Sequence, residues 1–89
     1  MITIGTQVRL KVPCLGNPIG ALGVCYEHYF IGHEGCSVIF ENGNYDGFDE
    51  FEQESFLEVV KQTDLAYNFK NVSQLVHDWY QGLFQEFLK

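Results

Sequence analysis

Basic residues are scarce in this sequence. Five Lys and Arg stand against twelve Asp and Glu, which gives a formal net charge of −7. A surface this negative repels phosphate backbones, because nucleic-acid binding depends on cationic side chains that neutralise phosphates. We therefore expect no nucleic acid among the partners of this protein.

Long apolar runs and a disulfide framework are also missing. No window approaches the ~18 apolar residues that a membrane span needs, and residues 1–11 show no basic leader before an apolar run. The cysteines Cys14, Cys25 and Cys36 are an odd number, which suits reduced thiols in a reducing compartment. These absences predict a cytoplasmic protein that does not contact a membrane.

Apolar side chains, by contrast, are plentiful. They make up 46% of the 89 residues and include eight Phe, five Tyr and one Trp. This supply is enough for a core that needs neither disulfides nor a metal, and the length suits one domain. We expect a single domain over residues 1–89 and no cofactor.

Five short strands are predicted in the first sixty or so residues. Residues 6–12 alternate between apolar and polar side chains, which is the period of a half-buried strand. Residues 13–20 contain both prolines and predict a long loop. Further strands are expected at 21–29, 36–40, 44–48 and 56–60, with a hairpin turn at Asn42-Gly43 and a single turn over 49–55. The spacing favours a small β-barrel over residues 1–61.

The period changes after a polar linker at residues 62–70. Apolar side chains from Val72 to Leu88 recur at i, i+3, i+4 and i+7, and Asn71 with Gln74 can cap the first turn. We expect an amphipathic helix over about 72–88. Its aromatic stripe must be covered, either by the barrel's open end or outer sheet face, or by a second copy or a partner. The oligomeric state, monomer or homodimer, stays open.

One group of residues has the composition of a metal site. Cys25, His28, His33 and Cys36 straddle a predicted hairpin, and thiolate and imidazole are the ligands that zinc prefers. Along a regular strand, however, Cys25 and His28 point to opposite faces unless a bulge intervenes. A small zinc-binding protein is therefore the alternative function.

Motifs that would indicate an enzyme are absent. The sequence has no Gly-rich phosphate loop before a helix and no nucleophile elbow, and its carboxylates have no apolar setting that would raise a pKa. Cys25 with His28 and Glu27 has the residue types of a nucleophilic site, but nothing else marks it. We expect no catalytic activity.

Negative charge is concentrated in one stretch. Seven of the twelve acidic residues lie between positions 41 and 58, which contain no Lys or Arg. This stretch predicts either a solvated face or a docking surface for a basic protein partner. The contact residues that we expect are the aromatics Tyr26, Tyr29, Tyr45 and Phe48 and the acids Asp46, Asp49, Glu50 and Glu52.

Several short segments resemble a known family. They are Gly5-Thr6-Gln7-Val8-Arg9-Leu10, residues 20–24 (GALGV), Val38-Ile39-Phe40, Asn44-Tyr45-Asp46-Gly47 and residues 56–60 (FLEVV). Their layout resembles SH3-like barrels of the kind seen in the small peripheral subunit of photosystem I and in the variable chain of ferredoxin-thioredoxin reductase.

What the resemblance implies is a five-stranded SH3-like barrel over about 5–60 and a non-catalytic accessory or adaptor role. The chain departs from that family in its extra helix after residue 70. It also lacks the basic residues that such subunits use to attract acidic electron carriers.

Overall fold

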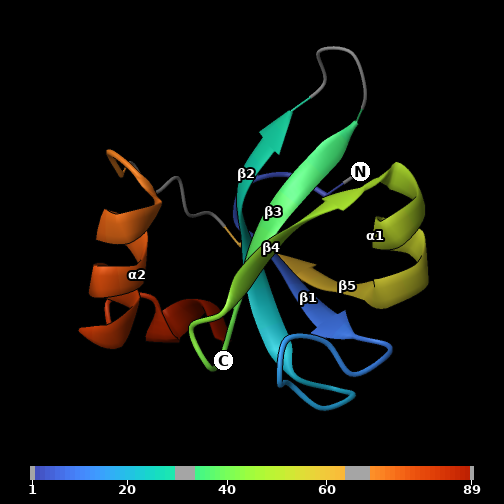
Figure 1. The fold of residues 1–89 in the computed structure, drawn as a ribbon, viewed down its shortest axis with the longest axis horizontal. Helices are drawn as coiled ribbons and strands as arrows, with labels where there is room; N and C mark the ends of the chain where they lie inside the picture. The colour runs from blue at the N-terminus through green and yellow to red at the C-terminus, as the bar shows by residue number, and fades with distance from the viewer. Residues whose placement is uncertain (1, 30–33, 64–68, 89) are drawn as a thin grey trace.

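The five predicted strands are present and form one antiparallel sheet. The computed structural model describes residues 2–29, 34–63 and 69–88. The sheet has the order β4-β3-β2-β1-β5 (Figure 1). Its strands are β1 (Thr6–Leu10), β2 (Leu22–Tyr29), β3 (Gly35–Phe40), β4 (Tyr45–Asp49) and β5 (Leu57–Gln62).

The sheet is open, so the predicted barrel is not confirmed. Within the described residues, hydrogen-bonded ladders join each strand to its neighbours in that order, and none joins the edge strands β4 and β5. Helix α1 (Glu50–Phe56) connects these two strands and contacts both of them. A short helix therefore bridges the opening, where a closed barrel would have a further ladder.

Helix α1 corrects the prediction of a single turn over residues 49–55. Asp49 caps the helix: its side chain accepts a hydrogen bond from the backbone N–H of Glu52, and the Glu52 side chain accepts one from the backbone N–H of Asp49. This reciprocal pair satisfies two backbone donors at the helix start. It compensates for the short length, which alone disfavours a helix.

A first core fills the inner face of the sheet. Val8 and Leu10 of β1 meet Val38 and Phe40 of β3, and all four are at most 1% exposed. Phe48 of β4 packs edge-on against Phe40, with ring centroids 6.1 Å apart. This core also contains Ile2, Ala21, Cys25, Cys36 and Leu57.

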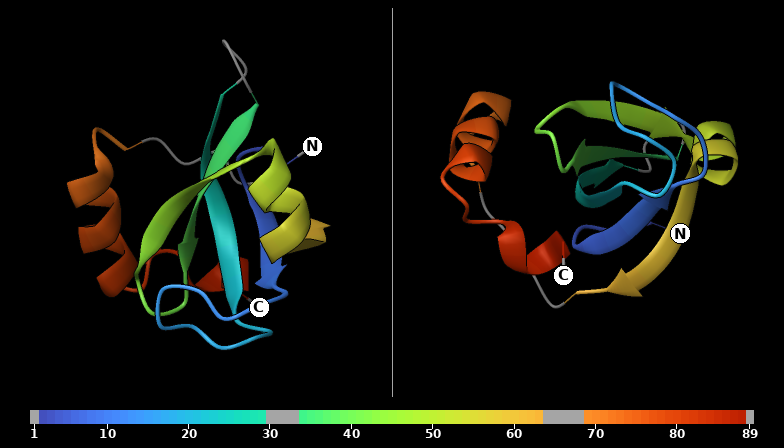
Figure 2. Two further views of the ribbon diagram at one scale, coloured as in Figure 1. Left: turned by 45° about the vertical axis from the view of Figure 1, so that its right-hand side comes forward. Right: turned by 90° about the horizontal axis from the view of Figure 1, so that it is seen from below.

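A second core lies on the opposite face, beneath a C-terminal lid formed by α2 (Val72–Tyr80) and the 3-10 helix η1 (Gln85–Leu88). Its members are Val24, Tyr26, Ile39, Leu75, Trp79, Phe84 and Phe87. Figures 1 and 2 show α2 and α1 on opposite sides of the sheet. Because both faces of the sheet are covered, every residue of β3 is buried. The aromatic stripe thus packs on the outer sheet face, one of the two internal solutions expected.

The lid corrects the prediction of one continuous helix over 72–88. Helix α2 ends at Tyr80, and Gly82 follows with a φ of +83°, a backbone conformation that glycine adopts without steric cost. The chain then folds back, and η1 brings Phe87 onto the sheet. Phe84 and Phe87, which follow the break, are 2% and 7% exposed in the second core. No helix in the described ranges is long and apolar enough to cross a membrane.

Asparagines hold the long loop over residues 13–20 against the β3–β4 turn. The side-chain amides of Asn42 and Asn44 both donate to the carbonyl oxygen of Leu15, at 3.0 and 2.8 Å. Asn17, which is 4% exposed, donates to the side-chain oxygen of Asn42 at 3.0 Å. Asn42 and Asn44, which belong to the β3–β4 turn, therefore also fix the position of a loop that is distant in sequence.

Candidate functional site

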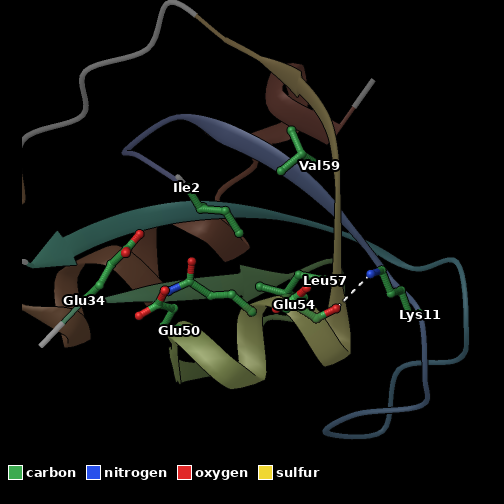
Figure 3. A pocket seen from close by; sticks show the side chains of 8 residues that line it. Ile2, Lys11, Glu34, Glu50, Glu54, Leu57 and Val59 are labelled. Atoms are coloured by element: carbon green, nitrogen blue, oxygen red, sulfur yellow. Dashed lines mark hydrogen bonds between the residues drawn. The ribbon is translucent and has the colours of Figure 1, made fainter.

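A hollow that combines charge with apolar surface lies between α1, β5 and the N-terminal segment (Figure 3). We call it the acidic groove. Its volume is about 430 Å³, within the range of small ligand sites. It is lined by Ile2, Lys11, Glu34, Glu50, Gln53, Glu54, Leu57 and Val59.

Apolar side chains make up the floor of the acidic groove. Ile2 and Leu57 belong to the first core and are 6% and 4% exposed, so their positions are fixed by packing. Val59 is 55% exposed because it lies on the edge strand β5 beyond the cover of α1. A partner that covered Val59 would gain roughly 25 cal/mol for each Å² of apolar surface removed from water.

Carboxylates surround this floor. Glu50 and Glu54 come from α1 and Glu34 from the residue before β3. The only cation lining the groove within the described residues is Lys11, whose Nζ donates to the backbone carbonyl oxygen of Glu54 at 2.8 Å. This bond holds the ammonium group at one end of the groove. The balance of charge along the groove is therefore negative.

The aromatic residues predicted to contact a partner are divided between cores and surface. Phe48 and Tyr26 are 3% and 7% exposed and belong to the first and second core. Tyr45 is 46% exposed and packs edge-on against Tyr26, with centroids 6.4 Å apart. Tyr29 is half-buried, and its ring lies over Gly35, where a Cβ atom would clash with it. Only Tyr45 offers a largely accessible ring.

The acidic residues predicted for the same surface are all exposed. Asp49 and Glu52 are engaged in the capping box of α1, and Asp46 accepts a hydrogen bond from the backbone N–H of Gly47. Of these acids only Glu50 lines the acidic groove. The remaining groove residues were missed because they come from five separate segments, which only the fold brings together.

The Cys/His group is rearranged by a β-bulge. Cys25 pairs with Val38 and His28 pairs with Cys36, with a register shift between positions 25 and 27 of β2. The bulge therefore places Cys25, His28 and Cys36 on one face of the sheet, so the opposite faces expected for a regular strand are not observed. His33, the fourth predicted ligand, lies outside the described residues.

The two thiols of this group are enclosed in the first core. Cys25 and Cys36 are 2% and 0% exposed, and a hydrogen bond between them lowers the pKa of Cys25 and raises the pKa of Cys36. Cys25 also donates to the carbonyl oxygen of Glu27 at 3.2 Å. The described part of the chain contains no group of three His, Cys, Asp or Glu side chains that could hold a metal ion. Zinc binding stays a prediction, for elemental analysis of the purified protein to test.

Comparisons of this chain with protein-family models, with curated proteins and with solved structures found no match.

Proposed function

We propose that this protein is a non-catalytic interaction module that binds a basic segment of a partner protein in the acidic groove. The observation that carries the proposal is the groove itself, in which three glutamates surround a floor of Ile2, Leu57 and Val59. Isolated surface acids attract any cation, whereas acids around an apolar floor select a segment that pairs Lys or Arg with an apolar side chain. The SH3-like resemblance, which implies an accessory role, supports the same class of function.

The acidic residues would first increase the rate of association with a basic partner. Asp46, Asp49 and Glu52 are exposed on or next to α1, close in sequence to Glu50 and Glu54, so the negative field extends beyond the groove. Such a field accelerates the encounter with a basic partner, and the acceleration falls as salt rises. The apolar floor supplies the part of the affinity that salt does not remove.

A peptide of alternating Lys and Leu, labelled with fluorescein, tests the proposal by fluorescence anisotropy. Each exposed ion pair contributes roughly 0.2 to 1 kcal/mol, so the triple variant Glu34→Gln, Glu50→Gln, Glu54→Gln should weaken binding about threefold or more. The matched control Glu27→Gln, Asp46→Asn, Glu86→Gln removes the same charge outside the groove. It should weaken binding less than about twofold.

Two results would contradict this function. Equal weakening by both triple variants would show that net charge attracts the peptide and the groove does not. Val59→Ser removes apolar surface at the floor without changing charge, and it should weaken binding at high salt as well as at low salt. No effect of Val59→Ser would exclude the floor from the contact.

A further inference from the structure

A second hollow is lined by residues of the C-terminal lid. Figure 1 shows α2 of this lid on the side of the sheet opposite α1. We call the hollow the lid pocket. Its volume is about 210 Å³, below the ~300 Å³ at which sites for drug-sized ligands begin. A pocket of this volume suits a ligand smaller than a typical drug molecule. The pocket is lined by Glu41, which follows β3, and by Trp79, Tyr80, Gly82, Phe84, Gln85 and Leu88 from the C-terminal segment.

The aromatic walls are set by the fold before any ligand arrives. Trp79 and Phe84 lie with ring centroids 5.2 Å apart and are 8% and 2% exposed, so they form a fixed inner wall. The turn at Gly82 brings Phe84 back beside Trp79. Binding would therefore cost little ordering of these side chains.

Tyr80 forms the outer wall and is held against the β3–β4 turn. Its hydroxyl donates to the backbone carbonyl oxygen of Asn42 at 3.3 Å, although 67% of the residue is exposed. A Cβ atom on Gly43 would lie 2.5 Å from that hydroxyl, so the absence of a side chain at position 43 makes room for the ring. An exposed tyrosine is thus kept at the pocket without being part of a core.

The electrostatics of the lid pocket favour a cation. Glu41 is exposed at its rim, and one carboxylate oxygen accepts the backbone N–H of Leu22 at 2.9 Å, which positions the group. No Lys, Arg or His of the described segments lines the pocket. The C-terminal end of α2, at Tyr80, adds the negative end of the helix dipole.

We propose that the lid pocket binds a compact organic cation that carries a methylated ammonium group. Aromatic rings attract such a cation through their negative faces, and Tyr80, which is 67% exposed, offers most of the ring surface here. Trp79 and Phe84 are nearly buried and, with Leu88, add apolar surface for the methyl groups. An unmodified ammonium group is more strongly hydrated and needs hydrogen-bond acceptors on several sides. Here Glu41 supplies the single negative charge. This site is separate from the acidic groove and does not depend on the function proposed for it.

Titration with choline tests the proposal, since Trp79 is the single tryptophan and gives one indole N–H signal in a ¹H–¹⁵N NMR spectrum. We expect a saturable shift of that signal with a Kd of about 1 mM. The neutral isostere 3,3-dimethylbutan-1-ol has the same shape without the charge, and it should bind at least about tenfold more weakly. Equal binding of the two probes would overturn the proposal, because the pocket would then recognise only apolar shape.

Two variants of Tyr80 separate the contribution of its ring to binding from that of its hydroxyl group. Tyr80→Leu should weaken choline binding about three- to tenfold, whereas Tyr80→Phe keeps the ring and should change it less than about twofold. Glu41→Gln keeps an acceptor for Leu22 and removes the charge, so it should also weaken binding. Leu83→Ala is the matched control, because Leu83 is 57% exposed and does not line the pocket. Unchanged affinity in both Tyr80→Leu and Glu41→Gln would contradict the assignment.

The methylated ammonium group can come from a free small molecule or from a modified lysine side chain of a protein. A parallel titration with a short peptide that contains trimethyl-lysine distinguishes these sources. Tighter binding of the peptide assigns the site to modified proteins, and tighter binding of choline assigns it to a free cation. Failure of both probes to shift the Trp79 signal overturns the proposal.

Discussion

The side-chain amide of Gln7 donates a hydrogen bond to the backbone carbonyl oxygen of Phe87, 2.6 Å away. The bond joins β1 to the last turn of the lid, and the two residues are 80 positions apart in sequence. Gln7 is 2% exposed and faces the second core, where an apolar side chain would be the usual choice. Its amide thus satisfies a carbonyl group of the short helix η1 that water cannot reach freely.

Replacement of Gln7 should loosen the lid. Gln7→Met keeps a long side chain and removes the donor, which leaves the Phe87 carbonyl group without this bond and should lower the free energy of unfolding by about 1 to 3 kcal/mol. Urea unfolding followed by Trp79 fluorescence measures the loss. The control Gln81→Met changes an exposed glutamine and should stay within about 0.5 kcal/mol of the parent. Equal stability of the two variants would show that the buried bond contributes nothing.

The packing of α2 onto the sheet predicts a contrast between two leucines of the lid. Leu75 is 0% exposed and lies in the second core, so Leu75→Ala should cost about 2 to 5 kcal/mol through lost burial and a cavity. Leu83 is 57% exposed, and Leu83→Ala should cost less than about 0.5 kcal/mol. Thermal unfolding followed by circular dichroism checks both values. A large loss in Leu83→Ala would indicate that the lid packs differently.

The capping box of α1 predicts that a hydrogen-bond acceptor at position 49 stabilises the protein more than the negative charge there does. Asp49→Ala removes the acceptor for the N–H of Glu52 and should cost about 1 kcal/mol. Asp49→Asn keeps an oxygen acceptor, and Asn caps helices as well as Asp does, so this variant should lose only a few tenths of a kcal/mol. Chemical denaturation of the two variants decides the matter. A loss in Asp49→Asn as large as that in Asp49→Ala would assign the effect to the negative charge.

The phenol of Tyr26 predicts a loss of stability at alkaline pH. Burial away from water raises the pKa of Tyr26 to about 12, although a hydrogen bond with Ser37 opposes the shift. In the unfolded chain the pKa is about 10, so above that pH the unfolded state releases a proton that the folded state retains. The stabilisation is fully present below about pH 10 and is lost as the pH rises toward 12.

The variant Tyr26→Phe isolates this effect. The parent protein should lose more unfolding free energy than Tyr26→Phe between pH 9 and pH 11, as measured by urea unfolding at each pH. Every other side chain is common to the two proteins, so its contribution cancels in the comparison. Parallel pH profiles for the two proteins would show that the phenol titrates alike in the folded and unfolded states.

Local patterns in the sequence were enough to find the strands and the first turn of α2. Alternation in residues 6–12 and the Asn42-Gly43 pair predict β1 and the β3–β4 hairpin, and Asn71 does cap α2, with its side chain accepting from the N–H of Gln74. These features depend on neighbours within about four positions, so the sequence shows them directly. The capping pair Asp49 and Glu52 was equally local, and the same rule would have found α1.

Other features depend on contacts between distant segments, and the sequence could not show them. The bulge in β2 that brings His28 to the face of Cys25 arises from its register with β3. The acidic groove joins Ile2 and Lys11 to Glu34 and α1, and the lid pocket joins Glu41 to Trp79. Which side chains meet is decided by strand order and by where the chain turns back.

The sequence by itself determined the elements of this protein, because hydrophobic period, caps and turn residues act over a few neighbouring positions. Only the tertiary structure decided that the sheet stays open beside α1, that the lid breaks at Gly82, and which residues line the two hollows. The physical reason is that the hydrophobic effect stabilises any arrangement that covers the apolar faces. The choice among such arrangements rests on the fit of side chains far apart in the chain.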